Sequence, residues 1–271
     1  MRFRLRITGP ILAAVSTVWT ATAQDATLPP EEIDSAAIVE AVSIPTPGEF
    51  FAALNKVERP NWSKVTRQAP PIAPGSRAKN ALNLGTRVSD GFIAVEAQDG
   101  QQVKNVGKDI IDLAKSLGVS QSILARGNSI NDFAENNEWN TLKEELEATE
   151  NEVKLQMLEQ KDDDLVTLVT VGAWLRGAQA VTDMVAENYL PESASLVRQP
   201  AIVGHLVSRI DALDQKLQAD ELVSNVKGGL AEIQTITASE EVPSAENVER
   251  IRTITTELVK AVCEPTSAPA P

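Results

Sequence analysis

The stretch from Leu165 to Leu175 constrains the fold most, because it is apolar on every side when its residues are placed at helical spacing. A helix of this kind has no face that suits water, so it must be buried all round. Three aspartates at 162–164 suit a helix start, and Pro191 disfavours the helical conformation in the residue before it. Residues 162–189 are therefore predicted to form a central helix on which the other helices pack.

Apolar residues recur at alternating spacings of three and four after residue 80, which is typical of helices in bundles. Besides the central helix, this pattern predicts helices at 81–95, 103–117, 123–134, 138–160, 203–217, 222–236 and 248–262. Gly118 is expected to end one helix, and Ser120 and Ser244 to cap two others. No alternating β-branched run lies between turn signals, and no tetratricopeptide-like repeat can be aligned. The predicted fold class is all-α, an irregular antiparallel helical bundle of about seven to eight helices with an extended proline-rich N-terminal arm.

The first residues have the composition of an export signal. A basic start, a short apolar run and a small-residue site before Gln24 predict cleavage there, and an uncleaved membrane anchor is the alternative. We therefore expect an exported, periplasmic protein with no transmembrane segment in its mature chain. The predicted parts are a signal peptide at 1–23, a proline-rich arm with short helices at 24–77, the bundle at 78–263 with an alternative sub-boundary at 190–199, and a disordered tail at 264–271.

Residues 24–77 hold eight prolines and are expected to be an arm rather than part of the core. One short helix is nevertheless well signalled within them, because Thr46 and Glu49 have the spacing of a capping box. Phe50 and Phe51 follow in a chain with few aromatic residues. This pair predicts that the short helix docks onto the main body.

The charge and cysteine content limit the classes of partner. The chain has 38 acidic and 25 basic residues, a formal net charge of −13 at pH 7, and cleavage at Gln24 would remove three arginines. Such a surface repels nucleic acid and anionic lipid headgroups, so neither is expected as a partner. Cys263 is the only cysteine, which rules out an intramolecular disulfide. It is expected to be a small apolar residue on the last helix, with an intermolecular disulfide as the alternative.

Two charged residues interrupt the predicted central helix. Arg176 and Asp183 are seven residues apart, so they lie on one face, and a charge there must be paired or reach solvent. Asp90, near Arg87 on the first bundle helix, is the expected partner of this face. Both helices carry glycines that permit close backbone approach, namely Gly85, Gly91, Gly172 and Gly177. A polar pocket between the helices is one interpretation, and the favoured one is a buried ion pair that fixes helix register.

Motifs for catalysis, metal binding and cofactor binding are missing from the sequence. His205 is the single histidine, and Arg209 stands where a zinc ligand one helical turn later would be needed. The aspartates at 162–164 lack the spacing of a calcium loop. Haem-attachment, serine nucleophile, phosphate-loop and dinucleotide motifs do not occur either. We therefore expect no catalytic, metal or cofactor-binding residue and no bound cofactor.

These features favour an exported, soluble, non-enzymatic helical protein that acts as a binding or scaffolding module of the cell envelope, through a protein partner or self-association. The alternative is a carrier of a small ligand in an inter-helix cavity, with Arg176 and Asp90 as polar contacts. A third class is an enzyme that uses two acidic side chains facing each other across a cleft.

Overall fold

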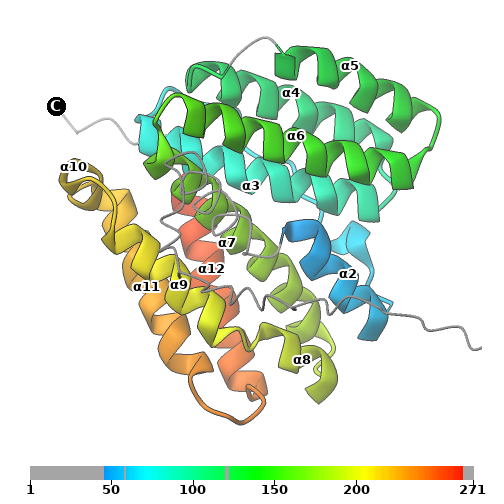
Figure 1. The fold of residues 1–271 in the computed structure, drawn as a ribbon. Coiled ribbons are helices and arrows are strands. Elements are labelled where there is room, and N and C mark those ends of the chain that lie inside the picture. The colour runs from blue at the N-terminus through cyan, green and yellow to red at the C-terminus, as the bar shows by residue number, and fades with distance from the viewer. Residues whose placement is uncertain (1–45, 58, 120–121, 265–271) are drawn as a thin grey trace, which may run out of the picture. The chain divides into compact units, whose positions relative to one another are not determined.

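The computed structural model describes residues 46–57, 59–119 and 122–264, which belong to one compact unit. The predicted signal peptide, residues 24–45, Ser120 and the segment after Glu264 lie outside the described residues. Within the described part, the chain forms helices and no strands (Figure 1), which confirms the all-α prediction. It has more helices than the seven to eight expected, because short helices occur between the long ones.

In chain order the elements are α2 (Pro47–Val57), the 3₁₀ helix η1 (Trp62–Lys64), α3 (Arg77–Glu96), α4 (Gly100–Ser116), α5 (Ser122–Glu135), α6 (Trp139–Glu159), α7 (Asp163–Glu187), α8 (Pro191–Val197), α9 (Pro200–Asp211), α10 (Gln215–Gln218), α11 (Glu221–Thr237) and α12 (Ala245–Cys263). The main discrepancy with the predicted bounds is at α9, which ends at Asp211 instead of continuing to residue 217. The side-chain amide of Gln218 donates to the carbonyls of Asp211 and Leu213, and Asp214 caps the separate helix α10. This side-chain capping ends the helix despite its apolar seam.

Helix α7 is the centre of the packing, as the sequence predicts. Every residue from Leu165 to Ala178 is buried, and α3 and α12 cover α7 most extensively among the described helices. By length and composition α7 could also cross a membrane, since the mean hydropathy of its most apolar 18-residue window is 1.2. In the structure 94% of that window is buried by the surrounding helices, as in the core helix of a bundle.

Helices α3 and α7 run in the same general direction. Arg77 near the start of α3 pairs with Asp162 at the start of α7, at 2.7 Å, and Asp90 in the second half of α3 pairs with Arg176, at 2.6 Å. Between these ends the two backbones touch, and the Ser89 hydroxyl donates to the Ala173 carbonyl at 2.7 Å. The periodic seams predicted that these helices pack but did not predict this parallel direction.

Helices α3 to α6 follow one another and pack as neighbours (Figure 1). All four end in the same turn, with one residue at positive φ: Gln98 at 54°, Gly118 at 83°, Asn137 at 57° and Lys161 at 60°. The amide of the next residue then donates to the carbonyl five residues earlier, as from Asp99 to Ala94 at 2.9 Å. The helix-ending role of Gly118 is confirmed. Its three counterparts take the left-handed conformation without glycine, at a cost of about 1–2 kcal/mol each.

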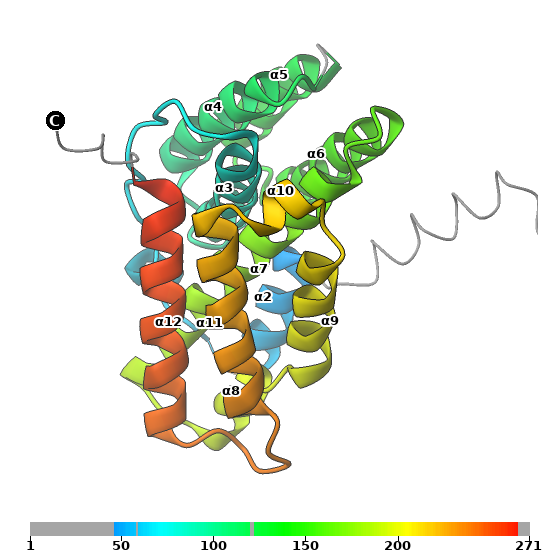
Figure 2. The ribbon, with the colours of Figure 1, turned by 90° about the vertical axis from the view of Figure 1, so that its left-hand side faces the viewer.

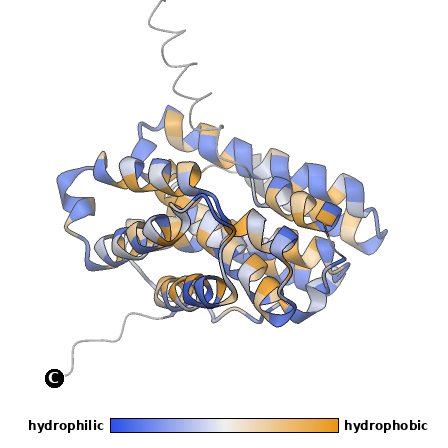
Figure 3. Ribbon diagram, turned by 90° about the horizontal axis from the view of Figure 1, so that it is seen from below, coloured by the Kyte–Doolittle hydropathy of each residue, from blue (hydrophilic) through white to orange (hydrophobic). Residues whose placement is uncertain are grey.

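Helices α9, α11 and α12 form the other side of the bundle (Figure 2). Helix α12 is antiparallel to α7, because Gln179 bonds to Thr256 at 3.3 Å while the later residue Asp183 bonds to the earlier residue Arg252 at 2.9 Å. The predicted cap of α12 is confirmed, since the Ser244 hydroxyl accepts the backbone N–H of Asn247. In Figure 3 the outer helices show hydrophilic and hydrophobic stripes, which matches the periodicity used to predict them.

The first described residues are part of the core. The capping box is formed, because the Glu49 amide donates to the Thr46 hydroxyl and the Thr46 amide donates to the Glu49 carboxylate. Phe51 and Leu54 on α2 are fully buried, and Trp62 lies against Phe51 with ring centroids 4.7 Å apart. The short helix docks as predicted, but the expectation that 24–77 would be an arm outside the core is wrong for residues 46–65. Proline content excluded long helices there and did not exclude burial.

Replacing Trp62 with phenylalanine should lower the free energy of unfolding by about 1 kcal/mol. The Trp62 indole N–H donates to the Asn55 side-chain oxygen at 2.9 Å, and the same Asn55 amide donates to Glu96. Phenylalanine keeps most of the apolar contact but leaves Asn55 short of one partner. Urea unfolding measures the effect, with Trp139→Phe as the control, because the half-buried Trp139 indole makes no hydrogen bond with the described residues. Equal losses in the two variants would contradict this assignment.

Candidate functional site

A buried carboxylate on α3 is the centre of a charged cluster. Asp90 is 4% exposed, and its Oδ1 accepts from Arg176 Nε of α7 at 2.6 Å. Arg67 donates to the same carboxylate from Nε at 3.1 Å and from Nη2 at 2.8 Å. The ion pair between Asp90 and Arg176 that the sequence suggested is therefore present. Arg67 was missed, because it lies in a proline-rich segment without periodicity and its only signal was its charge.

Arg87 is the third arginine of the cluster, and it is fully buried. Its Nη1 lies 4.0 Å from the Asp90 carboxylate, and its Nε lies 3.4 Å from the half-buried Asp109 of α4. Only Nη2 makes a hydrogen bond, to the Pro70 carbonyl at 2.7 Å. Its Nε and Nη1 have no hydrogen-bond partner among the described residues, which is costly for a buried guanidinium.

The cluster holds residues 65–70, which we call the strap, against α3 and α7. Arg176 Nη2 donates to the Val65 carbonyl at 2.6 Å, and the Gln102 side-chain amide donates to the Arg67 carbonyl at 2.8 Å. The bond from Arg87 to the Pro70 carbonyl completes the series. Three carbonyls of an irregular segment are thus satisfied by side chains, as buried backbone groups require. This is direct support for the architectural interpretation of the ion pair.

Asp183 does not join the cluster. Its carboxylate accepts from Arg252 of α12 at 2.9 Å, and its side chain is 31% exposed. Burial raises the pKa of Asp183, and the hydrogen bond and charge of Arg252 offset only part of that shift. The seven-residue spacing predicted that Asp183 and Arg176 share one face of a helix. For Asp183, however, Arg252 of α12 is a nearer partner than any residue of α3.

The pKa of Asp90 reflects its burial and its contacts with Arg176 and Arg67. Burial alone would raise the pKa of this carboxyl, but the charges and hydrogen bonds of Arg176 and Arg67 outweigh it and hold the pKa below its ordinary value of 3.8. Burial also lowers the pKa of Arg176, although guanidinium groups stay charged in proteins. The cluster is therefore an ionised carboxylate surrounded by an excess of positive charge.

The stability of the protein should fall as the pH drops below about 4. A carboxyl with a depressed folded-state pKa contributes stability that is present above its unfolded value and is lost as the pH falls through its folded value. For Asp90 that window begins at 3.8 and extends downward. Urea unfolding between about pH 5 and pH 2 checks this. Asp90→Asn, measured at a temperature where both proteins fold, should reduce the slope, and an unchanged slope would contradict the role of Asp90.

A solvent-open hollow of about 180 Å³ lies beside the cluster, between the strap and α12. It is lined by Arg67, Gln68, Pro70, Gln179, Thr256, Val259, Lys260, Cys263 and Glu264, and we call it the strap hollow. The Cys263 sulfur is 3.5 Å from Arg67 Nη2 and 3.4 Å from the Thr86 hydroxyl. Arg67 Nη1 makes no hydrogen bond with the described residues. The hollow thus combines the Arg67 guanidinium, the Lys260 ammonium group, the Glu264 carboxylate, neutral polar groups and a thiol.

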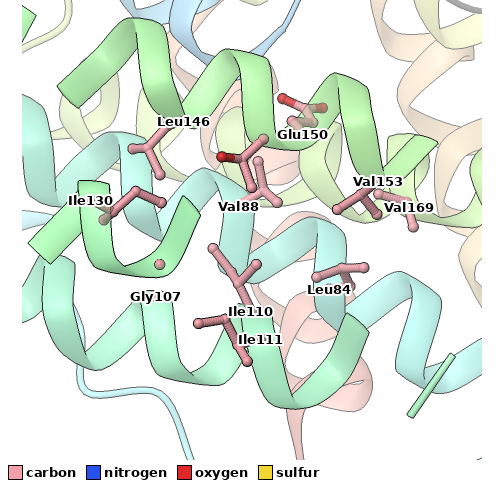
Figure 4. A pocket seen from close by; sticks show the side chains of 12 residues that line it. Leu84, Val88, Gly107, Ile110, Ile111, Ile130, Leu146, Glu150, Val153 and Val169 are labelled. Carbon is pink, nitrogen blue, oxygen red and sulfur yellow. The ribbon is translucent and has the colours of Figure 1, made fainter. Parts of the chain in front are cut away.

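The inter-helix cavity predicted between the glycine-bearing helices is not found in the described part of the chain. A Cβ on Gly85 would lie 2.0 Å from the Val169 carbonyl oxygen, so α3 and α7 leave no space there. The apolar cavity between α3, α4, α5 and α6 (Figure 4) is only about 20 Å³, which is room for about one water molecule. Glu150 lies at its edge in Figure 4, on α6. The strap hollow is the better candidate for a ligand.

No group of three or more His, Cys, Asp or Glu side chains within the described ranges is placed to hold a metal ion. The candidate site therefore contains two cationic groups, one carboxylate, amide and hydroxyl groups and a thiol, and no set of metal ligands among the described residues. Those groups suit the binding of a negatively charged molecule. Comparison with known proteins adds no assignment, since no family model, no curated protein and no solved structure matches this chain.

Proposed function

We propose that this protein is an exported, non-enzymatic binding protein of the cell envelope, and that it binds a small ligand in the strap hollow. The N-terminal composition supports export, as argued from the sequence. The single observation that carries the binding role is Arg67, whose guanidinium is fixed by Asp90 on one side and lines an open hollow on the other. A guanidinium held rigid by a carboxylate is preorganised, so little entropy is lost when it binds a ligand.

The contents of the hollow support binding over catalysis. A carboxylate-dependent enzyme needs two acidic side chains facing each other, and the hollow is lined by one, Glu264, which lies 3.8 Å from Lys260. A thiol nucleophile needs a general base, and the polar neighbours of Cys263 are Arg67, Thr86 and Asn83. None of these three side chains takes up a proton readily at neutral pH.

A second candidate function is scaffolding through a protein partner. Tyr189 and Leu190, which follow α7, and Val242 are exposed large apolar residues. The Tyr189 hydroxyl donates to the Pro243 carbonyl at 3.0 Å, which brings the loop with Val242 to the same end of the bundle. Leu190 also lines a polar hollow of about 210 Å³ with Arg59 and other residues. Exposed apolar side chains at one end of the bundle, one of which lines a polar hollow, favour a protein contact.

Native mass spectrometry of the mature protein, purified from the envelope fraction of its host, separates these functions. A small extra mass on the monomer that disappears in an Arg67→Gln variant supports ligand binding in the strap hollow. A multiple of the monomer mass, or a second protein, that disappears when Tyr189 and Leu190 are both replaced by serine supports scaffolding. A bare monomer in every preparation would contradict both proposals.

A further inference from the structure

We propose that the ligand of the strap hollow is a small oxyanion, and that a carboxylate is the preferred form. This inference rests on the proposed function, because it assigns the chemistry of the same site. It is carried by the charge balance of the cluster, by the unused donors around the hollow and by the size of the hollow.

The charge balance leaves the site positive in an acidic protein. Three arginines, Arg67, Arg87 and Arg176, share two carboxylates, because Asp90 contacts all three and Asp109 lies 3.4 Å from Arg87 Nε. Lys260 and Glu264 in the hollow offset each other, so one positive charge remains. The chain as a whole has a net charge of −13. An excess of buried cations is unfavourable unless an anion comes close, so the cluster favours a negatively charged occupant of the adjoining hollow.

Several residues that line the hollow carry polar groups that can donate. Arg67 Nη1 has no hydrogen-bond partner in the described part of the chain, and Lys260 is 67% exposed with only Glu264 near it, at 3.8 Å. Gln179 accepts from Arg176 Nη1 at 3.2 Å and donates to the Thr256 hydroxyl oxygen at 3.3 Å. The Thr256 hydroxyl proton is thereby left free to donate. Arg67 and Gln179 are held in place by these bonds, and the exposed Lys260 adds a mobile positive charge, so together they suit an oxyanion.

The size of the hollow, its guanidinium group and its apolar lining favour a carboxylate. A volume of about 180 Å³ holds a molecule of a few carbon atoms, or the carboxylate end of a larger one whose remainder stays in solvent. Arg67 Nε and Nη2 already bond to Asp90 and Cys263, so Nη1 is the nitrogen that can donate to one oxygen of a carboxylate. Pro70 and Val259 in the lining provide apolar contact for a short carbon chain. The source is either a free metabolite-sized acid or the C-terminal carboxylate of a peptide, and the experiment separates them.

Cys263 supplies a position-specific test, because it is the only cysteine and it lines the hollow while being 3% exposed. The rate of its alkylation by iodoacetamide is measured on the full mature chain with acetate, succinate, phosphate, the dipeptide Ala-Ala or its C-terminal amide. Chloride at equal ionic strength is the control. At saturation a carboxylate should slow alkylation at least about tenfold, and the amidated dipeptide should have no effect. Protection by Ala-Ala alone identifies a peptide C-terminus as the source, and protection by acetate or succinate identifies a free acid.

Two variants test the named donors. Arg67→Gln should raise the half-saturating concentration at least about tenfold, since it removes a charge-assisted hydrogen bond. Arg67 also holds Asp90, so circular dichroism must show that this variant is folded. Lys260 is exposed, so Lys260→Gln should fold normally. It should raise the half-saturating concentration about twofold to fivefold. Lys227→Gln is the matched control, because Lys227 on α11 pairs with Asp211 and does not line the hollow. It should leave the concentration unchanged.

Each remaining outcome overturns the inference. Protection by phosphate alone would show that a carboxylate is not preferred, and protection that persists unchanged in Lys260→Gln and Arg67→Gln would show that the anion acts elsewhere. If no oxyanion protects Cys263 while native mass spectrometry still detects a ligand that Arg67→Gln removes, the proposed function stands and only the ligand class is wrong.

Discussion

Replacing Gly85 or Gly172 with alanine is expected to lower the free energy of unfolding by about 3 kcal/mol or more. A Cβ on Gly85 would lie 2.0 Å from the Val169 carbonyl oxygen, and one on Gly172 would lie 2.0 Å from the Leu82 carbonyl oxygen. Both obstacles are backbone atoms, so no side chain can rotate away and the two central helices must separate. Because α7 is buried all round, that separation disturbs contacts on both sides of the bundle.

Gly228→Ala is the matched control for these two variants. Gly228 lies inside α11, and a Cβ there would meet no atom within 4 Å. Alanine should therefore stabilise the protein by up to about 1 kcal/mol through helix propensity alone. Urea unfolding of the three variants gives the comparison. A near-normal unfolding midpoint for Gly85→Ala or Gly172→Ala would show that α3 and α7 are not in backbone contact.

Replacing Asp90 with asparagine is expected to cost about 3–5 kcal/mol, because it leaves the buried Arg87 and Arg176 and the partly buried Arg67 without their shared counter-charge. The side chain keeps its size, so the loss reports the charge rather than a cavity. The strap should loosen at the same time, since a neutral amide would hold Arg67 through one oxygen where the carboxylate uses two. Faster alkylation of Cys263, whose sulfur is 3.5 Å from Arg67, is the expected accompanying result.

Asp183→Asn is the control for Asp90→Asn, because it removes the charge of a second, partly exposed carboxylate on the helix that carries Arg176. Asp183 is partly exposed and pairs with Arg252, itself 43% exposed, so solvent screening should limit the loss to about 1 kcal/mol. Urea unfolding of the two variants and of the unchanged protein gives the loss of unfolding free energy for each substitution. If Asp90→Asn cost no more than Asp183→Asn, the cluster would not depend on a buried ion pair and the role assigned to Asp90 would be wrong.

The candidate site was only partly predictable. Arg176 and Asp90 stood out as charges in apolar helices, and their pairing could be argued because a buried charge needs a partner. Arg67 could not be found in the same way, because the strap has no periodicity that fixes the direction of its side chains. The strap hollow depends on Cys263 and Lys260 lying opposite Arg67. That proximity follows from the docking of α12 on α7, which is not encoded in any local pattern.

The sequence by itself determined the helical elements. An all-round apolar stretch requires burial, spacings of three and four identify helix faces, and Ser244, Thr46 and Gly118 mark helix ends through local hydrogen bonds and backbone conformation. Only the tertiary structure decided the parallel contact of α3 and α7, the docking of α12 on α7 and the anchoring of the strap by arginines. These features depend on groups far apart in the chain, whose free energies become favourable only after the helices have packed.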